Sequence, residues 1–139
     1  MKAKVSIIAL LALTLPLAAA AQQQPQTPEQ REKQLYENIQ KQVDDLAGRL
    51  DLEDWQIFYA DSILTRNYTD LSREFEKQSA NKVSDSSIYQ LLQDACAEKN
   101  YEAFKLILTE EQWAKYLKQG AARAKKDRDR RAAKRQKQS

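Results

Sequence analysis

The sequence predicts an all-α protein of four helical segments in a bent or elongated hairpin-like bundle, with a projecting basic C-terminal helix. Three observations support this fold class. The 139 residues include only two glycines and three prolines, which disfavours a turn-rich β fold. Apolar residues recur at steps of three and four along most of the chain, as on one face of a helix. Helix-capping sequences stand before several of these runs.

Residues 1–21 are expected to be a secretory signal peptide. Lys2 and Lys4 precede an apolar run that ends in alanines and is followed by glutamines. This order of a basic start, a short apolar stretch and small residues is typical of such leaders. A membrane anchor is the alternative, but the run is short for a bilayer and contains Pro16. We therefore expect an exported protein, in the periplasm, without a transmembrane segment after cleavage.

Residues 22–27 are predicted to be a polar tether, after which the first helix begins. Thr27 is the expected N-cap, and Gln30 stands at the reciprocal position of a capping box. A proline occupies the first helical position, where its fixed backbone fits. The apolar face consists of Leu35, Ile39, Val43 and Leu46. Gly48 is the expected end of this helix.

The second helix is expected to start at Asp51 as N-cap, with Asp54 favourable near the positive helix end. Its apolar residues form two adjacent stripes, so the helix should touch more than one neighbour. One stripe contains Ile57, Ala60, Leu64, Tyr68, Leu71 and Phe75, and the other contains Trp55, Tyr59 and Ile63. The apolar pattern fades over residues 77–82.

Two further helices complete the predicted body, which spans residues 28–117. The third starts at one of the caps within residues 84–87, and Asn100 is its expected break. The fourth starts at a second capping box, in which Thr109 caps and Gln112 reciprocates. Its expected apolar contacts are Trp113, Tyr116 and Leu117.

The segment 118–139 is rich in alanine, lysine and arginine and has no large apolar side chain. Residues 22–114 hold 18 acidic and 10 basic residues, a net charge of −8, whereas residues 115–139 hold 2 acidic and 11 basic residues, a net charge of +9. We expect an exposed helix that projects from the body and acts as an electrostatic handle. Its basic residues are Lys118, Arg123, Lys125, Lys126, Arg128, Arg130, Arg131, Lys134 and Arg135, followed by Lys137.

An anionic envelope surface or an acidic partner would suit this tail. Nucleic acid is disfavoured, because the tail has no aromatic residue that would stack on bases. The alternative is a solvated tail that only keeps the protein soluble.

The side-chain inventory excludes several chemistries. The chain has no histidine and one cysteine, so a Ser-His-Asp triad, a His-ligated zinc and an internal disulfide are excluded. We expect no catalytic residues, no cofactor and no metal. Cys96 is interpreted as a small buried residue on a helix, in preference to a disulfide between two chains.

The segment Leu108-Thr109-Glu110-Glu111-Gln112 resembles the Leu-Thr-x-x-Gln signature of the Spy/CpxP family of small exported helical proteins. The family carries the signature twice. The earlier copy fits either aligned on Gln56 or aligned on Trp55. The second register is preferred, because it places Asp51 opposite Thr109 and Asp54 opposite Gln112.

The resemblance implies an elongated, often dimeric fold whose concave face holds unfolded proteins without ATP. Some members inhibit sensors of envelope stress. The aromatic residues Trp55, Phe58, Tyr59, Trp113 and Tyr116 are most simply core residues, but they are also the candidates for an exposed client-binding surface or a homodimer interface. Two hypotheses follow, a chaperone-like holdase for envelope proteins and a scaffold that docks through its basic tail.

Overall fold

The computed structural model describes residues 25–139, and the predicted leader lies outside this range. Within residues 25–139 the chain is helical and contains no strand, which confirms the all-α class. The helices are α1 Pro28–Leu50, α2 Asp54–Ala80, α3 Ser86–Ile107, α4 Glu110–Tyr116 and α5 Ala122–Gln138, with a π-helical turn Leu117–Ala121 between the last two. If α4, this turn and α5 are taken as one bent segment, the described chain has the four helical segments that the sequence predicts.

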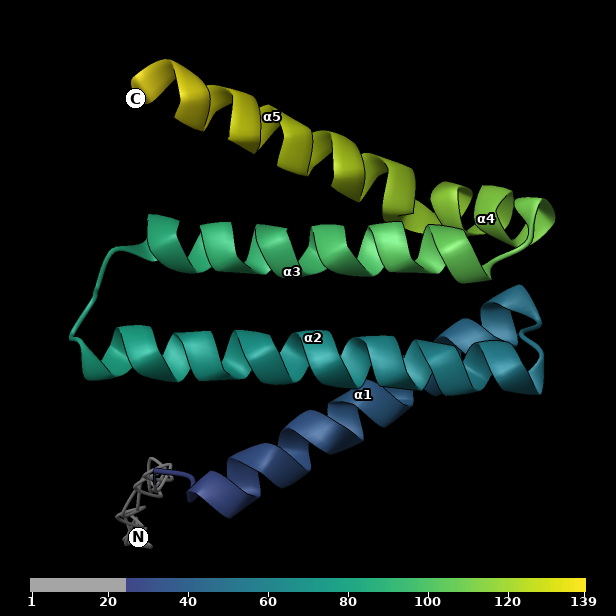
Figure 1. The fold of residues 1–139 in the computed structure, drawn as a ribbon, viewed down its shortest axis with the longest axis horizontal. Coiled ribbons are helices and arrows are strands. Elements are labelled where there is room, and N and C mark those ends of the chain that lie inside the picture. The colour runs from purple at the N-terminus through teal and green to yellow at the C-terminus, as the bar shows by residue number, and fades with distance from the viewer. Residues whose placement is uncertain (1–24) are drawn as a thin grey trace, which may run out of the picture.

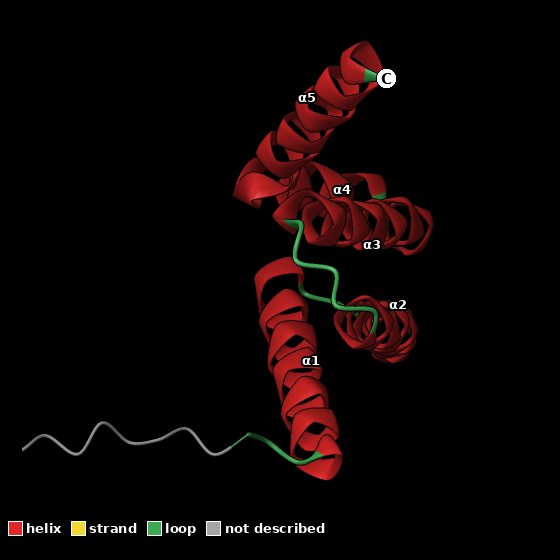
Figure 2. Ribbon diagram, turned by 90° about the vertical axis from the view of Figure 1, so that its left-hand side faces the viewer, coloured by secondary structure: helices red, strands yellow, loops and turns green. Residues whose placement is uncertain are grey.

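The helices form an elongated bundle around an antiparallel hairpin of α2 and α3 (Figure 1). The view along this hairpin shows α1 beside α2, while α4 and α5 lie beyond α3 (Figure 2). The chain turns twice at the same end of the hairpin, once between α1 and α2 and once between α3 and α4 (Figure 1). Both predicted motif segments therefore lie at this end.

The apolar core is built where the first three helices meet. Its buried members are Ile39, Val43, Leu46 and Leu50 from α1, Ala60 and Leu64 from α2, and Phe104 from α3. Leu64 is fully buried, and burial of such a side chain contributes about 1.5–3 kcal/mol. At the far end of the hairpin, the Tyr89 hydroxyl donates a hydrogen bond to the Val83 carbonyl at 2.8 Å and fixes the loop between α2 and α3.

The first helix ends later than the sequence predicts. Gly48 lies within α1, which continues to Leu50 because that leucine is a core residue with 2% of its surface exposed. Asp51 then adopts the left-handed conformation, with φ 51° and ψ 53°, and its N–H reaches the Ala47 carbonyl. Aspartate is one of the few residues that tolerate this conformation. Asp51 thus ends α1 and does not cap α2.

Asn100 does not break the third helix. It lies inside α3 with 6% of its surface exposed, and its Oδ1 accepts a hydrogen bond from Asn67 Nδ2 at 2.7 Å. A buried amide needs such a partner. This pair joins α3 to α2, and the uninterrupted helix carries Phe104 into the core.

The helical segment that follows Thr109 bends at Gly120, where φ is 121°. Glycine alone adopts this conformation without strain. Figure 1 shows that the chain reverses at the turn between α3 and α4, and that the bend then sets α5 at an angle to α4. The basic segment is therefore not a straight continuation of α4.

Candidate functional site

The two motif segments meet through the side chains of Gln56 and Gln112. Gln56 Nε2 donates to Gln112 Oε1 at 2.6 Å, and Gln112 Nε2 donates back to Gln56 Oε1 at 3.0 Å. Each oxygen also accepts a backbone N–H at the start of its own helix, from Glu53 at 2.9 Å and from Thr109 at 3.0 Å. Each amide therefore serves its own helix and the opposite motif at once.

The same two amides also bind the ends of the preceding helices. Gln56 Nε2 donates to the Ile107 carbonyl at 2.9 Å, and Gln112 Nε2 donates to the Leu50 carbonyl at 3.3 Å. Gln56 is 1% exposed, and these bonds satisfy an amide that would be costly to bury alone. The pair joins the ends of α1 and α3 to the starts of α2 and α4, so it is a structural joint that positions the residues beside it.

This geometry corrects the preferred register of the first motif. Glu53 is the N-cap of α2 and corresponds to Thr109, while Gln56 corresponds to Gln112. Asp54 is the first residue of α2 and does not hold the reciprocal position. The register aligned on glutamine is the one that the structure has, because only the longer amide side chain reaches both its own cap and the other motif.

The predicted capping boxes at Thr27 and Thr109 are both present. Thr27 Oγ1 accepts the Gln30 N–H at 3.2 Å, and the Gln30 side chain accepts the Thr27 N–H at 2.9 Å. Thr109 Oγ1 accepts the Gln112 N–H at 3.2 Å. Leu108, which precedes the second box, packs against the core.

Three aromatic side chains stand exposed together on the first turns of α2. Trp55, Phe58 and Tyr59 have 48%, 67% and 51% of their surface exposed. The Tyr59 ring meets the other two edge to face, at centroid distances of 6.2 Å from Trp55 and 5.6 Å from Phe58. The Trp55 indole N–H donates to the Glu53 carboxylate at 2.6 Å, which fixes the orientation of this ring. We call these three residues the aromatic ledge.

A groove of about 740 Å³ lies between α2 and α3 beside the ledge. Tyr59 belongs to both, and Leu106 on the α3 side of the groove is 86% exposed. The other groove residues include the apolar Ile63 and Ala103 and the charged Arg66, Asp70, Lys99 and Glu102. The ledge and the groove together offer apolar side chains beside charges of both signs.

Trp113 and Tyr116, which the sequence also offered as client-binding residues, are placed differently. Both are partly buried and pack against the core. Trp113 meets Tyr101 edge to face at 4.9 Å, and Tyr116 meets Phe104 at 5.8 Å. Burial raises the pKa of the Tyr116 hydroxyl above its ordinary value. These two aromatics belong to the core, and only the three on α2 form an exposed surface.

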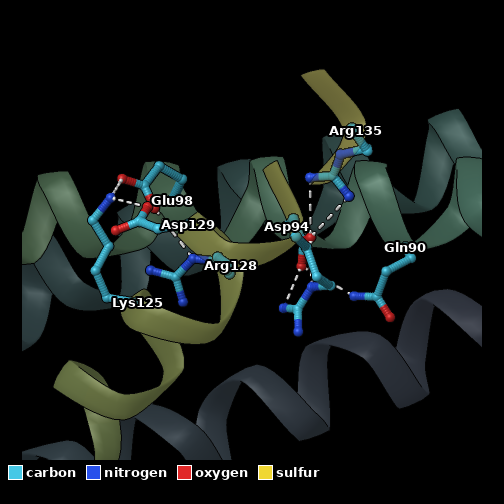
Figure 3. A network of polar contacts seen from close by, with 8 residues as sticks. Gln90, Asp94, Glu98, Lys125, Arg128, Asp129 and Arg135 are labelled. Atoms are coloured by element: carbon cyan, nitrogen blue, oxygen red, sulfur yellow. Dashed lines mark hydrogen bonds and ion pairs between the residues drawn. The ribbon is translucent and has the colours of Figure 1, made fainter. Parts of the chain in front are cut away.

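The basic residues of α5 include four that contact α3, and this corrects the expectation of a helix that simply projects into solvent. We call them and their acidic partners the ion-pair clamp; it consists of Lys125, Arg128, Arg131 and Arg135 on α5 and Asp94 and Glu98 on α3 (Figure 3). The chain reverses between α3 and α4, so α5 runs back beside α3 and one of its sides faces these two carboxylates (Figure 1).

Glu98 receives the first two basic side chains of the clamp. Lys125 Nζ lies 2.6 Å from its Oε1, and Arg128 Nε donates to its Oε2 at 3.1 Å. Both cations also lie over the Tyr101 ring, at 5.7 Å and 5.6 Å from its centroid. Hydrogen bonds to Asp129 and Glu98 raise the pKa of Lys125. Arg128 is only 9% exposed, which is unusual for an arginine unless it is paired.

Asp94 binds the other two basic side chains of the ion-pair clamp. Arg131 donates to its two carboxylate oxygens at 2.9 Å and 2.8 Å, and Arg135 lies 3.3 Å from Oδ2. Gln90 on the same helix donates to Asp94 at 3.0 Å. The hydrogen bond from Arg131 is the main reason that the pKa of Asp94 lies below its ordinary value. A carboxylate with 6% of its surface exposed is thus kept ionised by its partners.

Cys96 faces α2 from the buried side of α3. It is 6% exposed, and its thiol donates a weak hydrogen bond to the Asn67 carbonyl at 3.6 Å. Burial raises the pKa of this thiol. Among residues 25–139 there is no group of three or more histidine, cysteine, aspartate or glutamate side chains placed to hold a metal ion. In the same range, no helix combines the length and the apolar character needed to cross a bilayer.

Sequence reasoning missed Leu106 and the buried position of Arg128. Leu106 lies two residues after the buried Phe104, and a helical-wheel projection would have placed it on the outer side of α3. Arg128 had no distinguishing signal, because all basic residues of the tail share one composition. Its burial depends on contacts with Glu98 and Tyr101 of α3, which lie far from it in the sequence.

No protein-family model, curated protein sequence or solved structure matches the chain. The candidate functional residues are those that the geometry sets apart, which are the aromatic ledge and its groove and the exposed basic residues of α5.

Proposed function

We propose that this chain is a non-enzymatic binding protein that holds unfolded or aggregation-prone protein segments on the aromatic ledge and in the adjoining groove. The observation that carries the proposal is the joint exposure of Trp55, Phe58 and Tyr59 on one helix. Clustered apolar side chains outside a core mark interaction surfaces in soluble proteins. Trp and Tyr are also the residue types that contribute most to binding at interfaces.

The chemistry of the surface favours unfolded segments over a folded ligand of one shape. Aromatic faces accept many apolar side chains, and the groove adds Leu106 with charges of both signs. Extended segments of an unfolded protein carry apolar residues beside polar ones, so they match this mixture. The paired side chains of Gln56 and Gln112, which we call the glutamine joint, fix the start of α2. The ledge on this helix therefore loses little conformational freedom on binding.

The proposal agrees with the activity that the Spy/CpxP resemblance implies, an ATP-independent holdase of the envelope. Export to the periplasm remains part of the same proposal, and it depends on the leader predicted for residues 1–21. A second copy of this chain is the alternative occupant of the ledge. If a second copy occupies the ledge, substitution of the ledge residues should convert a dimer into a monomer. If a client occupies it, the mass of the protein in solution should not change.

The test compares two paired substitutions in an aggregation assay. We expect the protein to suppress light scattering by a chemically denatured client at a few-fold molar excess. Phe58→Ser with Tyr59→Ser should abolish most of this effect. The matched control is Tyr36→Ser with Leu91→Ser, two residues of similar exposure, 55% and 47%, outside the ledge.

Three outcomes would contradict the proposal. The protein gives no suppression with any of several clients, or the ledge pair and the control pair retain equal activity, or the ledge pair turns a dimer into a monomer. The last result assigns the ledge to a second copy. Helical circular dichroism of all variants establishes that the substitutions leave the fold intact, which is expected because all four side chains are exposed.

A further inference from the structure

The basic residues of α5 fall on two opposite sides of the helix. One set belongs to the ion-pair clamp and faces α3. The other set is exposed and follows steps of three and four residues, so its members share one side; they are Arg123, Lys126, Arg130, Lys134 and Lys137. We call these five residues the outer row.

The outer row is almost free of partners in the described structure. Arg130 lies 3.9 Å from the partly exposed Asp127, and none of the other four has a carboxylate oxygen within 4.0 Å among residues 25–139. Asp129, the other acidic residue of the tail, is engaged by Lys125 of the clamp at 2.8 Å. The body therefore leaves the positive charge of the outer row uncompensated.

We propose that the outer row docks the protein on a flat anionic lipid surface. From Arg123 to Lys137 a helix rises by about 21 Å, so the five cations form a straight row along one side of a rigid rod. Lipid phosphates present negative charge in a plane, which such a row meets along its whole length. The row includes no apolar side chain, so α5 lies on the surface and does not insert.

The ion-pair clamp argues against insertion of α5 into the groove of a nucleic-acid duplex. A helix in the major groove of a duplex is flanked by phosphates on both of its sides. The basic side chains on the side of α5 opposite the outer row are bound to the carboxylates of α3, and Arg128, bound to Glu98, is 9% exposed. The helix thus offers one side only, which suits a plane better than a groove. No aromatic residue in residues 118–139 is present to stack on single-stranded bases.

The clamp also gives the outer row its direction. Four long side chains reach across to Asp94 and Glu98 and fix the rotation of α5 about its axis (Figure 3). The outward direction of the row is therefore set by the fold. This docking is independent of the client-binding proposal, because the aromatic ledge lies on α2 and shares no residue with α5.

The test measures co-sedimentation of the protein, expressed with its own leader and purified, with two kinds of vesicle. One kind contains phosphatidylcholine alone, and the other contains phosphatidylglycerol with phosphatidylcholine. We expect binding to the anionic vesicles only, and binding that weakens as salt is added. Lys126→Gln with Arg130→Gln and Lys134→Gln should weaken it about a hundredfold, since each basic residue near an anionic membrane contributes about a factor of five.

A variant with the same net charge is the matched control. Lys33→Gln with Arg73→Gln and Lys77→Gln removes two lysines and one arginine that are exposed on α1 and α2, and it should bind the anionic vesicles as the unaltered protein does. Unchanged suppression of client aggregation by the outer-row variant would show that the two activities are separate.

The proposal is overturned if the unaltered protein does not bind the anionic vesicles. It is also overturned if the two triple variants lose affinity equally, because binding would then depend on net charge alone. It is overturned also if a DNA duplex binds more tightly than the vesicles at the same salt concentration. Equal helical circular dichroism of the three proteins is the check that α5 remains folded.

Discussion

Leu64 in α2 and Arg128 in α5 are both buried, yet their surroundings have nothing in common. Leu64 has none of its surface exposed and lies in a cluster of aliphatic and aromatic side chains. Arg128 is 9% exposed and lies between Glu98 and the Tyr101 ring. The first environment holds α1, α2 and α3 together, and the second holds α5 against α3.

The difference predicts how each region responds to its surroundings. Apolar burial is insensitive to salt at moderate concentrations, whereas ion pairs near the surface are screened. The body should therefore unfold as a cooperative unit, and α5 should detach before it when salt is added or the pH is lowered. The experiments below change one region at a time, beginning with the largest expected effect.

The largest effect is expected from Leu64→Ala. Removal of a fully buried leucine side chain leaves a cavity in the core and should cost about 2–5 kcal/mol of unfolding free energy. Urea unfolding, followed by tryptophan fluorescence, measures the loss. Leu91→Ala is the control, because Leu91 is 47% exposed and its truncation should cost much less. Equal losses at the two positions would contradict the assignment of the core.

The glutamine joint should give the next largest effect. Gln56→Ala and Gln112→Ala should each destabilise the body by about 1–3 kcal/mol, because each leaves buried hydrogen-bonding groups without partners. The double variant should lose less than the sum of the two single losses, since the side chains bind each other. Gln34→Ala is the control, because the hydrogen bond of this exposed side chain stays within α1. Additive losses would show that the two amides act separately.

The joint also illustrates what the sequence could and could not predict. The capping boxes at Thr27 and Thr109 could be predicted, because both hydrogen bonds of such a box form within four consecutive residues. The register of the first motif was predicted wrongly, because the choice of Gln56 depends on a partner 56 residues away. A side chain that serves two helices cannot be identified from either helix alone.

The helix boundaries also depend partly on local sequence, which can be read in advance, and partly on contacts with distant residues, which cannot. The stripes of apolar residues predicted the number of helical segments, since periodicity is a property of each helix. Local propensity predicts that helices end or break at Gly48 and Asn100, but Leu50 and Phe104 beyond them are core residues, and their burial outweighs the local preference. In the candidate site, the exposure of Trp55 and the burial of Trp113 could not be separated by composition, because both are tryptophans near helix starts.

A smaller effect, confined to α5, is expected from Asp94→Asn. This change removes the negative charge that receives Arg131 and Arg135, and it should weaken the attachment of α5 by about 1 kcal/mol, discounted because these arginines are partly exposed. Hydrogen exchange should speed up in residues 122–138 and not in α2. Asp70→Asn, which removes an exposed ion pair with Arg73 within α2 and none of the clamp's ion pairs, is the control. Faster exchange throughout the body would show that the clamp and the core form one cooperative unit.

The smallest effect is expected from acid, and its sign follows from the clamp. Hydrogen bonds from Arg131 hold the pKa of Asp94 below its ordinary value of 3.8, so the folded state binds this proton less readily than the unfolded state does. The stabilisation is complete above about pH 5 and is lost as the pH falls through the lowered pKa. Amide exchange in α5 should therefore be constant near neutrality and accelerate only in strong acid.

Other carboxylates also lose favourable contacts in acid, so the Asp94 contribution must be separated from theirs. Hydrogen bonds to backbone N–H groups at helix starts lower the pKa values of Glu29 and Asp85, and these groups will destabilise the body in the same range. The difference in α5 exchange between the unaltered protein and Asp94→Asn isolates the contribution of Asp94, because Glu98 and the helix-start carboxylates are common to both. That difference should shrink to nothing in strong acid, where Asp94 is protonated and resembles the amide. A difference that persists there would mean that the asparagine disturbs α3 itself, and that charge is not what holds α5 in place.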